Sequence, residues 1–265
     1  MKLSFIGDNS LEGVESDSKL AAENGFDGIE YNFWGEFREL TLERVKQIAA
    51  IHQKYGTKAA MLGTWGFNPL ATDPAERADV HKLIDRQIEF AQVLKAPWLV
   101  TSCGQIHGEP IGRSIAEFAR TFPPILERIR KAGLKVAFYA VHGNSFLDTV
   151  ATLERVWEVC PDLKLKYDPA NWKDHGEDYL DLARRWGHKI GYVHIKDHMY
   201  LNGRSIAEPP AGMGDIEFPK VIAFLYQHGY DGYLSIEPHG GTWGRGELRR
   251  KNILLSKKYL EPMLI

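Results

Sequence analysis

Eight short apolar runs of strand type recur along the chain, and an amphipathic stretch with helical spacing follows each of them. The runs are LSFIG, DGIEYNF, KAAML, WLVTS, LKVAFYA, LKLKY, GYVHIK and GYLSIE, and the helical stretches centre near Leu20, Val45, Ile88, Ile125, Leu153, Leu182, Ile222 and Leu254. Neighbouring parallel strands need such helical crossovers. In 265 residues, eight βα units predict an α/β protein with one domain, residues 1–265, folded as a (β/α)8 TIM barrel.

The residues that punctuate these runs agree with this interpretation. Thr41 precedes LERVKQIAAIHQKY and Gly56 follows it, while Asp73 and Pro74 begin a long charged helix that ends before Pro97. The alternative is an open doubly wound sheet, which should carry a glycine-rich phosphate turn after its first strand. The segment FIGDNSLEG lacks G-x-G-x-x-G, and no P-loop motif occurs anywhere. The closed barrel is therefore favoured.

The charge balance and the hydropathy limit the partners. There are 33 basic and 35 acidic residues, which give a formal charge of −2. The chain therefore lacks the excess of positive charge that binding to a nucleic-acid backbone normally needs. No apolar run approaches the roughly 20 residues that span a bilayer, and the apolar stretch within MKLSFIGDNSLEG is too short for the hydrophobic region of a secretory signal. We therefore expect a cytoplasmic protein with neither a nucleic-acid nor a membrane partner, and the sequence leaves a homo-oligomer open.

Residues of metal-ligand type stand where three of the predicted strands end. They are Asp168, His194 and Glu237. In a barrel the carboxyl ends of all strands open on the same face, so these side chains should converge. Carboxylate oxygen and imidazole nitrogen suit one divalent ion such as Mn, Co, Mg or Zn. The fifth strand is the natural source of a fourth ligand, and we nominate His142, which shares strand parity with Ala140.

Each of these residues also has a plainer interpretation. A lone strand histidine is more often a hydrogen-bonded core or surface residue than a ligand, and an Asp before Pro is more often a turn residue. Four candidates at four successive strand ends nevertheless favour a metal site.

The segments YDPANW, YVHIKDH, GMGDIEF and YDGYLSIEPH resemble the xylose-isomerase-like superfamily of sugar isomerases and epimerases. The resemblance covers essentially the whole chain and is most specific over residues 130–240. It implies a TIM barrel with an Asp on strand six, a His on strand seven and a Glu on strand eight around one divalent metal. By resemblance these are Asp168, His194 and Glu237.

Strand five departs from the pattern of that superfamily. Its epimerases usually carry a Glu there, often in a Glu-Asn-His run, whereas this chain has Tyr139, Ala140, Val141 and His142. In the two-carboxylate epimerases this Glu and the strand-eight Glu form the acid–base pair. The Tyr-x-x-His arrangement is closer to the branch that contains inosose dehydratase, which removes water from a cyclic keto-polyol.

The predicted function is a metal-dependent isomerase or epimerase of a sugar or keto-polyol. The substrate carbonyl and its neighbouring hydroxyl would chelate the metal, and Glu237 would remove the adjacent proton to form an enediolate. Reprotonation gives isomerisation or epimerisation, whereas departure of a β-hydroxyl gives dehydration or lysis. The sequence leaves this choice open, together with the identity of the metal.

Other residues are expected to line the same face. Lys196, Lys166 and Arg204 are candidates to hydrogen-bond an oxyanion or a hydroxyl, and Glu30 is a candidate to bind a hydroxyl. His107 and His198 are candidate acids for the second step, and the loop from Met199 to Phe218 is expected to form a wall of the site. Flat rings that could stack on a sugar are those of Trp34, Trp65 and Trp172.

Two other functional classes compete with this prediction. Endonuclease IV shares the barrel and its metal chemistry, but its strands three and four end in histidines, and here the corresponding ends are KAAMLGTWG and VTSCGQ. A sugar-binding barrel without catalysis is the second alternative, and the missing strand-five Glu supports it. The surviving Asp, His and Glu favour an enzyme.

Overall fold

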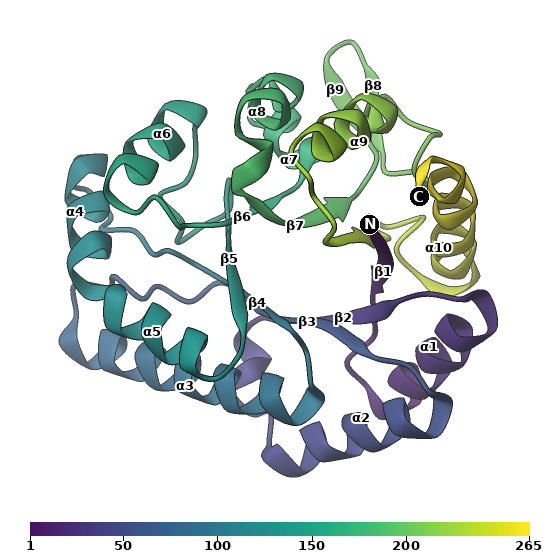
Figure 1. The fold of residues 1–265 in the computed structure, drawn as a ribbon, viewed down its shortest axis with the longest axis horizontal. Helices are drawn as coiled ribbons and strands as arrows, with labels where there is room; N and C mark the ends of the chain where they lie inside the picture. Colours follow the sequence, from purple (N-terminus) through teal and green to yellow (C-terminus); the bar gives the residue numbers. More distant parts are fainter. The chain divides into compact units, whose positions relative to one another are not determined.

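The computed structural model describes residues 1–265. The strands that carry the predicted pattern are β1 Lys2–Ile6, β2 Gly28–Phe33, β3 Ala59–Thr64, β4 Trp98–Thr101, β5 Lys135–Tyr139, β6 Leu165–Tyr167, β7 Ile190–Ile195 and β10 Tyr233–Ile236. Their order is β1-β10-β7-β6-β5-β4-β3-β2, which is a closed barrel (Figure 1). Each of these strands lies within one residue or two of the run predicted for it, and the TIM-barrel class is confirmed.

Helices follow the strands as expected. They are α1 Leu11–Asn24, α2 Leu42–Tyr55, α3 Pro74–Leu94, α4 Ile111–Thr121, α5 Pro123–Lys131, α6 Val150–Val159, α7 Pro169–Asp174, α8 Tyr179–Trp186, α9 Phe218–Gln227 and α10 Gly246–Leu260. The sequence did not predict α4 or α7. With only six residues, α7 is too short to show a helical period. Pro123 begins α5 directly after α4, and the one helical stretch predicted here, centred near Ile125, falls in α5.

The predicted helix boundaries rest on the expected capping contacts. Thr41 Oγ1 accepts a hydrogen bond from the Arg44 amide at 3.2 Å, and Asp73 Oδ1 accepts one from the Glu76 amide at 2.8 Å. Gly56 follows α2 with φ of 67°, a left-handed conformation that costs glycine little. These three sequence signals are confirmed.

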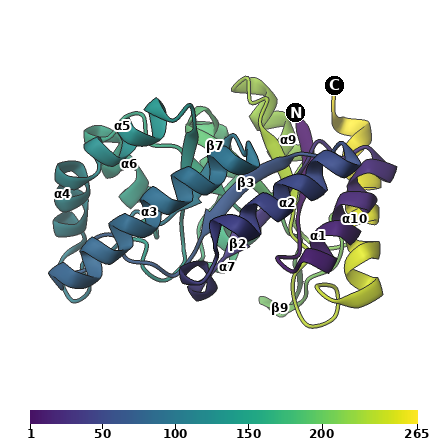
Figure 2. The same ribbon diagram turned by 90° about the horizontal axis from the view of Figure 1, so that it is seen from below.

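Backbone contacts group the chain into two compact units. We call them the C-terminal unit, Met1–Ile6 with Lys166–Ile265, and the N-terminal unit, Gly7–Leu165. In the C-terminal unit, β10 pairs in parallel with β1 on one side and β7 on the other. In the N-terminal unit, β2 to β5 pair in sequence order, and α1 lies beside α2 (Figure 2). The prediction of one domain over residues 1–265 stays a prediction.

The long connection between β7 and α9 contains a small hairpin. Its strands are β8 Met199–Leu201 and β9 Arg204–Ala207, and they pair antiparallel. Asn202 and Gly203 between them have φ of 51° and 74°, so the turn needs residues that tolerate the left-handed region. This connection contains no helix before α9, and the Asn-Gly signal of its hairpin was missed in the sequence.

Buried glutamine Gln87 ties helix α3 to the sheet of the N-terminal unit. Its amide donates to the carbonyl oxygens of Leu62, at 2.8 Å, and of Val100, at 3.0 Å. We expect Gln87→Leu to lower the free energy of unfolding by about 2 kcal/mol, because both carbonyls lose a buried donor. Urea unfolding measures the change. Gln92→Leu on the exposed side of the same helix is the matched control, and an equal effect of both variants would contradict the assignment.

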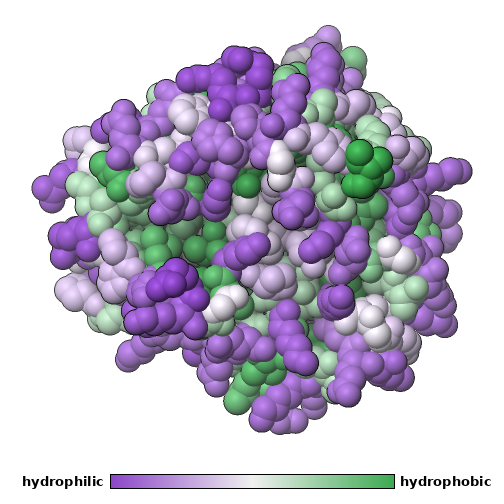
Figure 3. Space-filling view, viewed as in Figure 1, coloured by the Kyte–Doolittle hydropathy of each residue, from purple (hydrophilic) through white to green (hydrophobic).

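On the face drawn in Figure 3, hydrophilic side chains predominate and the hydrophobic ones form small separate groups. No helix of the structure combines the length and the hydropathy that crossing a bilayer requires.

Candidate functional site

Three predicted metal ligands converge in the C-terminal unit. Asp168 follows β6, His194 lies on β7 and Glu237 follows β10. Parallel pairing sets His194 opposite Ser235, and side chains two apart on a strand share a direction, so Glu237 faces the same side as His194. His194 Nδ1 lies 2.7 Å from Glu237 Oε2 and 3.9 Å from Asp168 Oδ2.

This donor set fits a divalent ion. One donor atom from each of the three residues lies within 4.8 Å of the other two. Ligand atoms around a tetrahedral ion with bonds of about 2.1 Å are roughly 3.4 Å apart, so small side-chain adjustments suffice. Two carboxylates and one imidazole suit Zn, Mn or Co, and no thiolate takes part.

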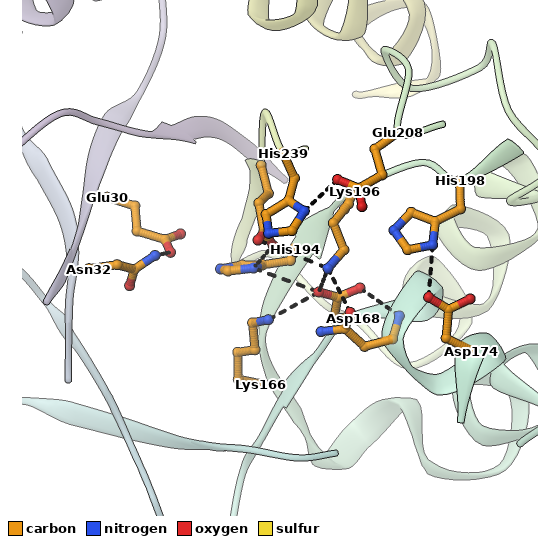
Figure 4. A network of polar contacts seen from close by, with 12 residues as sticks. Glu30, Asn32, Lys166, Asp168, Asp174, His194, Lys196, His198, Glu208 and His239 are labelled. Atoms are coloured by element: carbon orange, nitrogen blue, oxygen red, sulfur yellow. Dashed lines mark hydrogen bonds and ion pairs between the residues drawn. The ribbon is translucent and has the colours of Figure 1, made fainter. Parts of the chain in front are cut away.

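Two buried lysines surround the carboxylates (Figure 4). Lys166 Nζ lies 3.3 Å from Asp168 Oδ2, and Lys196 Nζ lies 3.5 Å from the same oxygen. Lys196 Nζ is also 4.0 Å from Glu237 Oε1. Both ammonium groups are almost fully buried, which is rare for lysine without a paired charge. The site therefore combines fixed negative and fixed positive charge in one small volume.

These charges decide the protonation states. Burial opposes ionisation of Asp168, but Lys196 and Lys166 outweigh it and lower its pKa to about 2. Burial acts in the same way on Glu237, and Lys196 and His194 hold its pKa well below the usual range. Burial would lower the pKa of Lys196, but Asp168 and Glu237 raise it above its ordinary value. At neutral pH both carboxylates are ionised and Lys196 is charged, so Lys196 can stabilise an anion but is a poor proton acceptor.

Helix α7 completes the cluster with a residue that the sequence reasoning missed. Asp168 caps this helix, because its Oδ1 accepts from the Asn171 amide at 3.1 Å. The Asn171 side chain turns back, and its Oδ1 accepts from Lys196 Nζ at 2.6 Å. Asp168 therefore also has a local structural role as a helix N-cap: one oxygen caps the helix while the other faces the lysines. The spacing Asp-x-x-Asn was the signal.

The other candidates of the C-terminal unit take different places. His198 is buried beside Asp174 and Tyr200. Trp172 is 1% exposed and packs in the core of its unit, whereas Arg204 is exposed on β9. Glu208, in the predicted wall loop, accepts a hydrogen bond from the His239 ring just beyond Glu237.

The remaining candidates lie in the N-terminal unit. Trp65 stacks on Tyr139 with ring centroids 4.4 Å apart, and the half-buried His142 meets the Trp65 ring edge-on at 5.5 Å. Trp34 is half exposed and stacks against Trp65.

Two polar candidates also lie in the N-terminal unit. Glu30 is fully buried and accepts a hydrogen bond from Asn32, and the exposed His107 contacts Asn144. The roles of these residues toward a substrate or a metal stay predictions.

The side chain of Asp197 holds part of the loop from Met199 to Phe218 in place. Its Oδ2 accepts from the amides of Gly212 and Gly214, both at 2.9 Å, and its Oδ1 accepts from the Ile216 amide at 3.0 Å. A Cβ on Gly214 would come within 2.4 Å of Asp197 Oδ1, so this approach requires glycine. Sequence reasoning passed over Asp197, although it stands between Lys196 and His198.

We expect Asp197→Ala to loosen this loop. Three amides, of which that of Ile216 is buried, would lose a charged acceptor, and about 3 kcal/mol of local opening free energy corresponds to amide exchange on the order of 100-fold faster at residues 212–216. Hydrogen exchange with mass spectrometry measures this, with α1 as the internal reference. Unchanged protection at residues 212–216 would show that other contacts hold the loop. Asp197→Asn keeps one acceptor oxygen and should have a smaller effect.

Comparison with known proteins identifies the family of this fold. The model of the xylose isomerase-like TIM barrel matches residues 18–259. The chain belongs to this family. A D-allulose 3-epimerase of Methylomonas sp. has a TM-score of 0.80 at 18% identity, covering 100% of this chain and 98% of that one. The IOLI protein, solved with a zinc atom, has a TM-score of 0.76 at 17% identity, covering 99% and 98%. At these identities the likeness shows the fold.

Curated relatives of this family member include an isomerase and a dehydratase. The human putative hydroxypyruvate isomerase is 23% identical over 257 residues, 88% of this chain and 87% of that protein. The inosose dehydratase of Clostridium perfringens is 23% identical over 124 residues, a match that spans only 41% of each protein. The named relatives are thus an epimerase, a putative isomerase and a dehydratase, and membership in their family favours an enzyme.

Proposed function

We propose that this protein is a metal-dependent isomerase or epimerase of a sugar or keto-polyol. The observation that carries the proposal is the convergence of Asp168, His194 and Glu237, with donor atoms within 4.8 Å of one another, beside two buried lysines. A divalent ion held by these residues, with His142 as the proposed fourth ligand, would act as a Lewis acid on a substrate carbonyl. We propose a cytoplasmic location, and a small polyhydroxy carbonyl compound as the only partner needed.

The chain's own residues supply the rest of the chemistry. Glu237 is the proposed base, since its carboxylate is ionised and lies at the rim of the cluster with a side chain 15% exposed. Its low pKa makes it a weak base, so it can act only on a proton made acidic by a neighbouring polarised carbonyl. The Lys196 ammonium is placed to stabilise the negative charge that develops on the substrate oxygen. Lys166 keeps Asp168 ionised.

One observation keeps β-elimination as a second candidate. Strand β5 ends at Tyr139 and continues with Ala140, Val141 and His142, so this segment offers no carboxylate for a symmetrical pair of bases. A dehydratase needs one base and a different acid for the leaving hydroxyl. Both reactions begin with the same proton removal, and a single assay can therefore detect either.

The test is exchange of the proton next to the carbonyl. The purified protein with added Mn²⁺ is incubated in D₂O with D-allulose, L-ribulose, hydroxypyruvate or an inosose, and proton NMR follows loss of that signal while chromatography identifies products. We expect exchange with at least one compound, loss of exchange after treatment with a chelator, and recovery with Mn²⁺. Calorimetric binding of a sugar without any exchange would contradict the proposal and favour a non-catalytic barrel.

A further inference from the structure

A second polar cluster lies next to the first, on the other end of helix α7. His198 Nδ1 lies 2.9 Å from Asp174 Oδ2, and the hydroxyl of Tyr200 donates to Asp174 Oδ1 at 2.5 Å. Burial and the Asp174 carboxylate raise the pKa of Tyr200, so its hydroxyl stays protonated and remains a donor. The carboxylate of Asp174 is thus held on one side by Tyr200 and binds the imidazole on the other.

Helix α7 sets the position of this cluster relative to the lysine. Asn171, which binds Lys196, and Asp174, which binds His198, are three residues apart on the same helix. Residues three apart on a helix lie on one face, roughly 4.5 Å apart along the axis. Lys196 and His198 therefore bind side chains on the same face of α7. In Figure 4 the ring nitrogen of His198 that faces away from Asp174 is turned toward the side of Lys196.

That nitrogen is the unusual atom of the cluster. His198 is 4% exposed, and its Nε2 is buried without a hydrogen-bond partner. Because a carboxylate only accepts, Nδ1 carries the proton shared with Asp174, and in the neutral ring Nε2 is a bare acceptor. A buried acceptor without a partner is unfavourable and calls for an explanation such as a ligand. The other histidine considered for an acid role, His107, is exposed and contacts Asn144.

We propose that His198 is the second acid–base group of the reaction and that Asp174 orients it. The assignment rests on the proposed function. Glu237 removes the proton, and the C–H electron pair moves into the enediolate. His198 in its protonated form then donates from Nε2, either to carbon or to a departing β-hydroxyl, which leaves as water. Protonation of the same carbon completes epimerisation, and protonation of the neighbouring carbon completes isomerisation once the hydroxyl proton has moved between the two enediolate oxygens. Glu237 returns its proton to solvent, and His198 takes one up again from solvent.

Because Glu237 and His198 act in different steps, mutation of His198 should slow product formation without slowing deuterium exchange. In D₂O, with a compound that exchanges in the wild type, His198→Gln should form product on the order of 100-fold more slowly. Exchange at the carbon next to the carbonyl should stay within about threefold, because Glu237 can still remove a proton and return a deuteron. Asp174→Asn should slow product formation about tenfold, again with exchange retained. The matched control is His175→Gln, an exposed histidine next to Asp174 that should change neither rate.

The outcomes separate the two proposals. No exchange by the wild type with any compound overturns the proposed function. Exchange and product formation that both persist in His198→Gln, or that fall together, overturn the assignment of His198 and leave the proposed function standing. Nitrogen-15 NMR of the histidine rings needs no substrate: we expect His198 in the neutral ring to carry its proton on Nδ1. A proton on Nε2 instead would overturn the role of Asp174.

Discussion

The Glu237→Gln variant is expected to exchange the proton next to the substrate carbonyl about 10³-fold more slowly than the wild type. General acid–base groups contribute roughly 10²- to 10⁴-fold, and the amide of glutamine cannot accept the proton. Glutamine has nearly the shape of glutamate and retains an oxygen near His194, so the local packing should persist. Exchange in D₂O at saturating Mn²⁺, followed by proton NMR, measures the rate.

The control for this variant is Glu217→Gln, an exposed carboxylate of the same unit at the start of α9. It should exchange at the wild-type rate. If Glu237→Gln keeps more than about a tenth of the wild-type exchange, another group is the base, and Glu237 acts only as a ligand. Far-ultraviolet circular dichroism shows whether both variants are folded.

The second large effect is expected on metal binding. We expect the wild type to bind about one Mn²⁺ or Zn²⁺ ion per chain, and His194→Ala to weaken binding more than 100-fold, because even outer contacts of metal ligands are worth 10- to 100-fold. His142→Ala should weaken binding comparably if this residue is the fourth ligand. Elemental analysis after dialysis and titration calorimetry measure stoichiometry and affinity.

His188→Ala, an exposed histidine before β7, is the control for both metal variants and should bind like the wild type. Wild-type affinity of His142→Ala would show that the site has three protein ligands. Absence of binding by the wild type would remove the Lewis acid from the proposed function. Two buried lysines already balance the negative charge of two carboxylates here. The affinity for a metal ion is therefore expected to be lower than at a site without such lysines.

The sequence by itself determined the strands and most helices, because hydrophobic periodicity and capping residues act locally. Thr41 and Asp73 cap their helices with bonds to amides three residues on, and the Asp-Pro pair at Asp73 starts its helix as expected. Strand ends also follow from local pattern, and parallel topology brings their carboxyl ends to one face. For this reason Asp168, His194 and Glu237 could be recognised as one site before their distances were known.

Only the tertiary structure decided which polar side chains pair around that site. Lys196 contacts Asn171 and His198 contacts Asp174 because the fold brings α7 next to the segment that follows β7. The local sequence of a six-residue helix does not predict such contacts. The same holds for Asp197, which accepts hydrogen bonds from three amides in a loop fifteen to nineteen residues further on.

The protonation states also depend on contacts between distant residues. Burial disfavours ionisation of Asp168 and Glu237, and the charge of the buried lysines outweighs this effect, so both pKa values fall below their ordinary range. Periodicity and capping are short-range and readable from the chain, whereas burial and charge pairing depend on which distant residues the fold brings together.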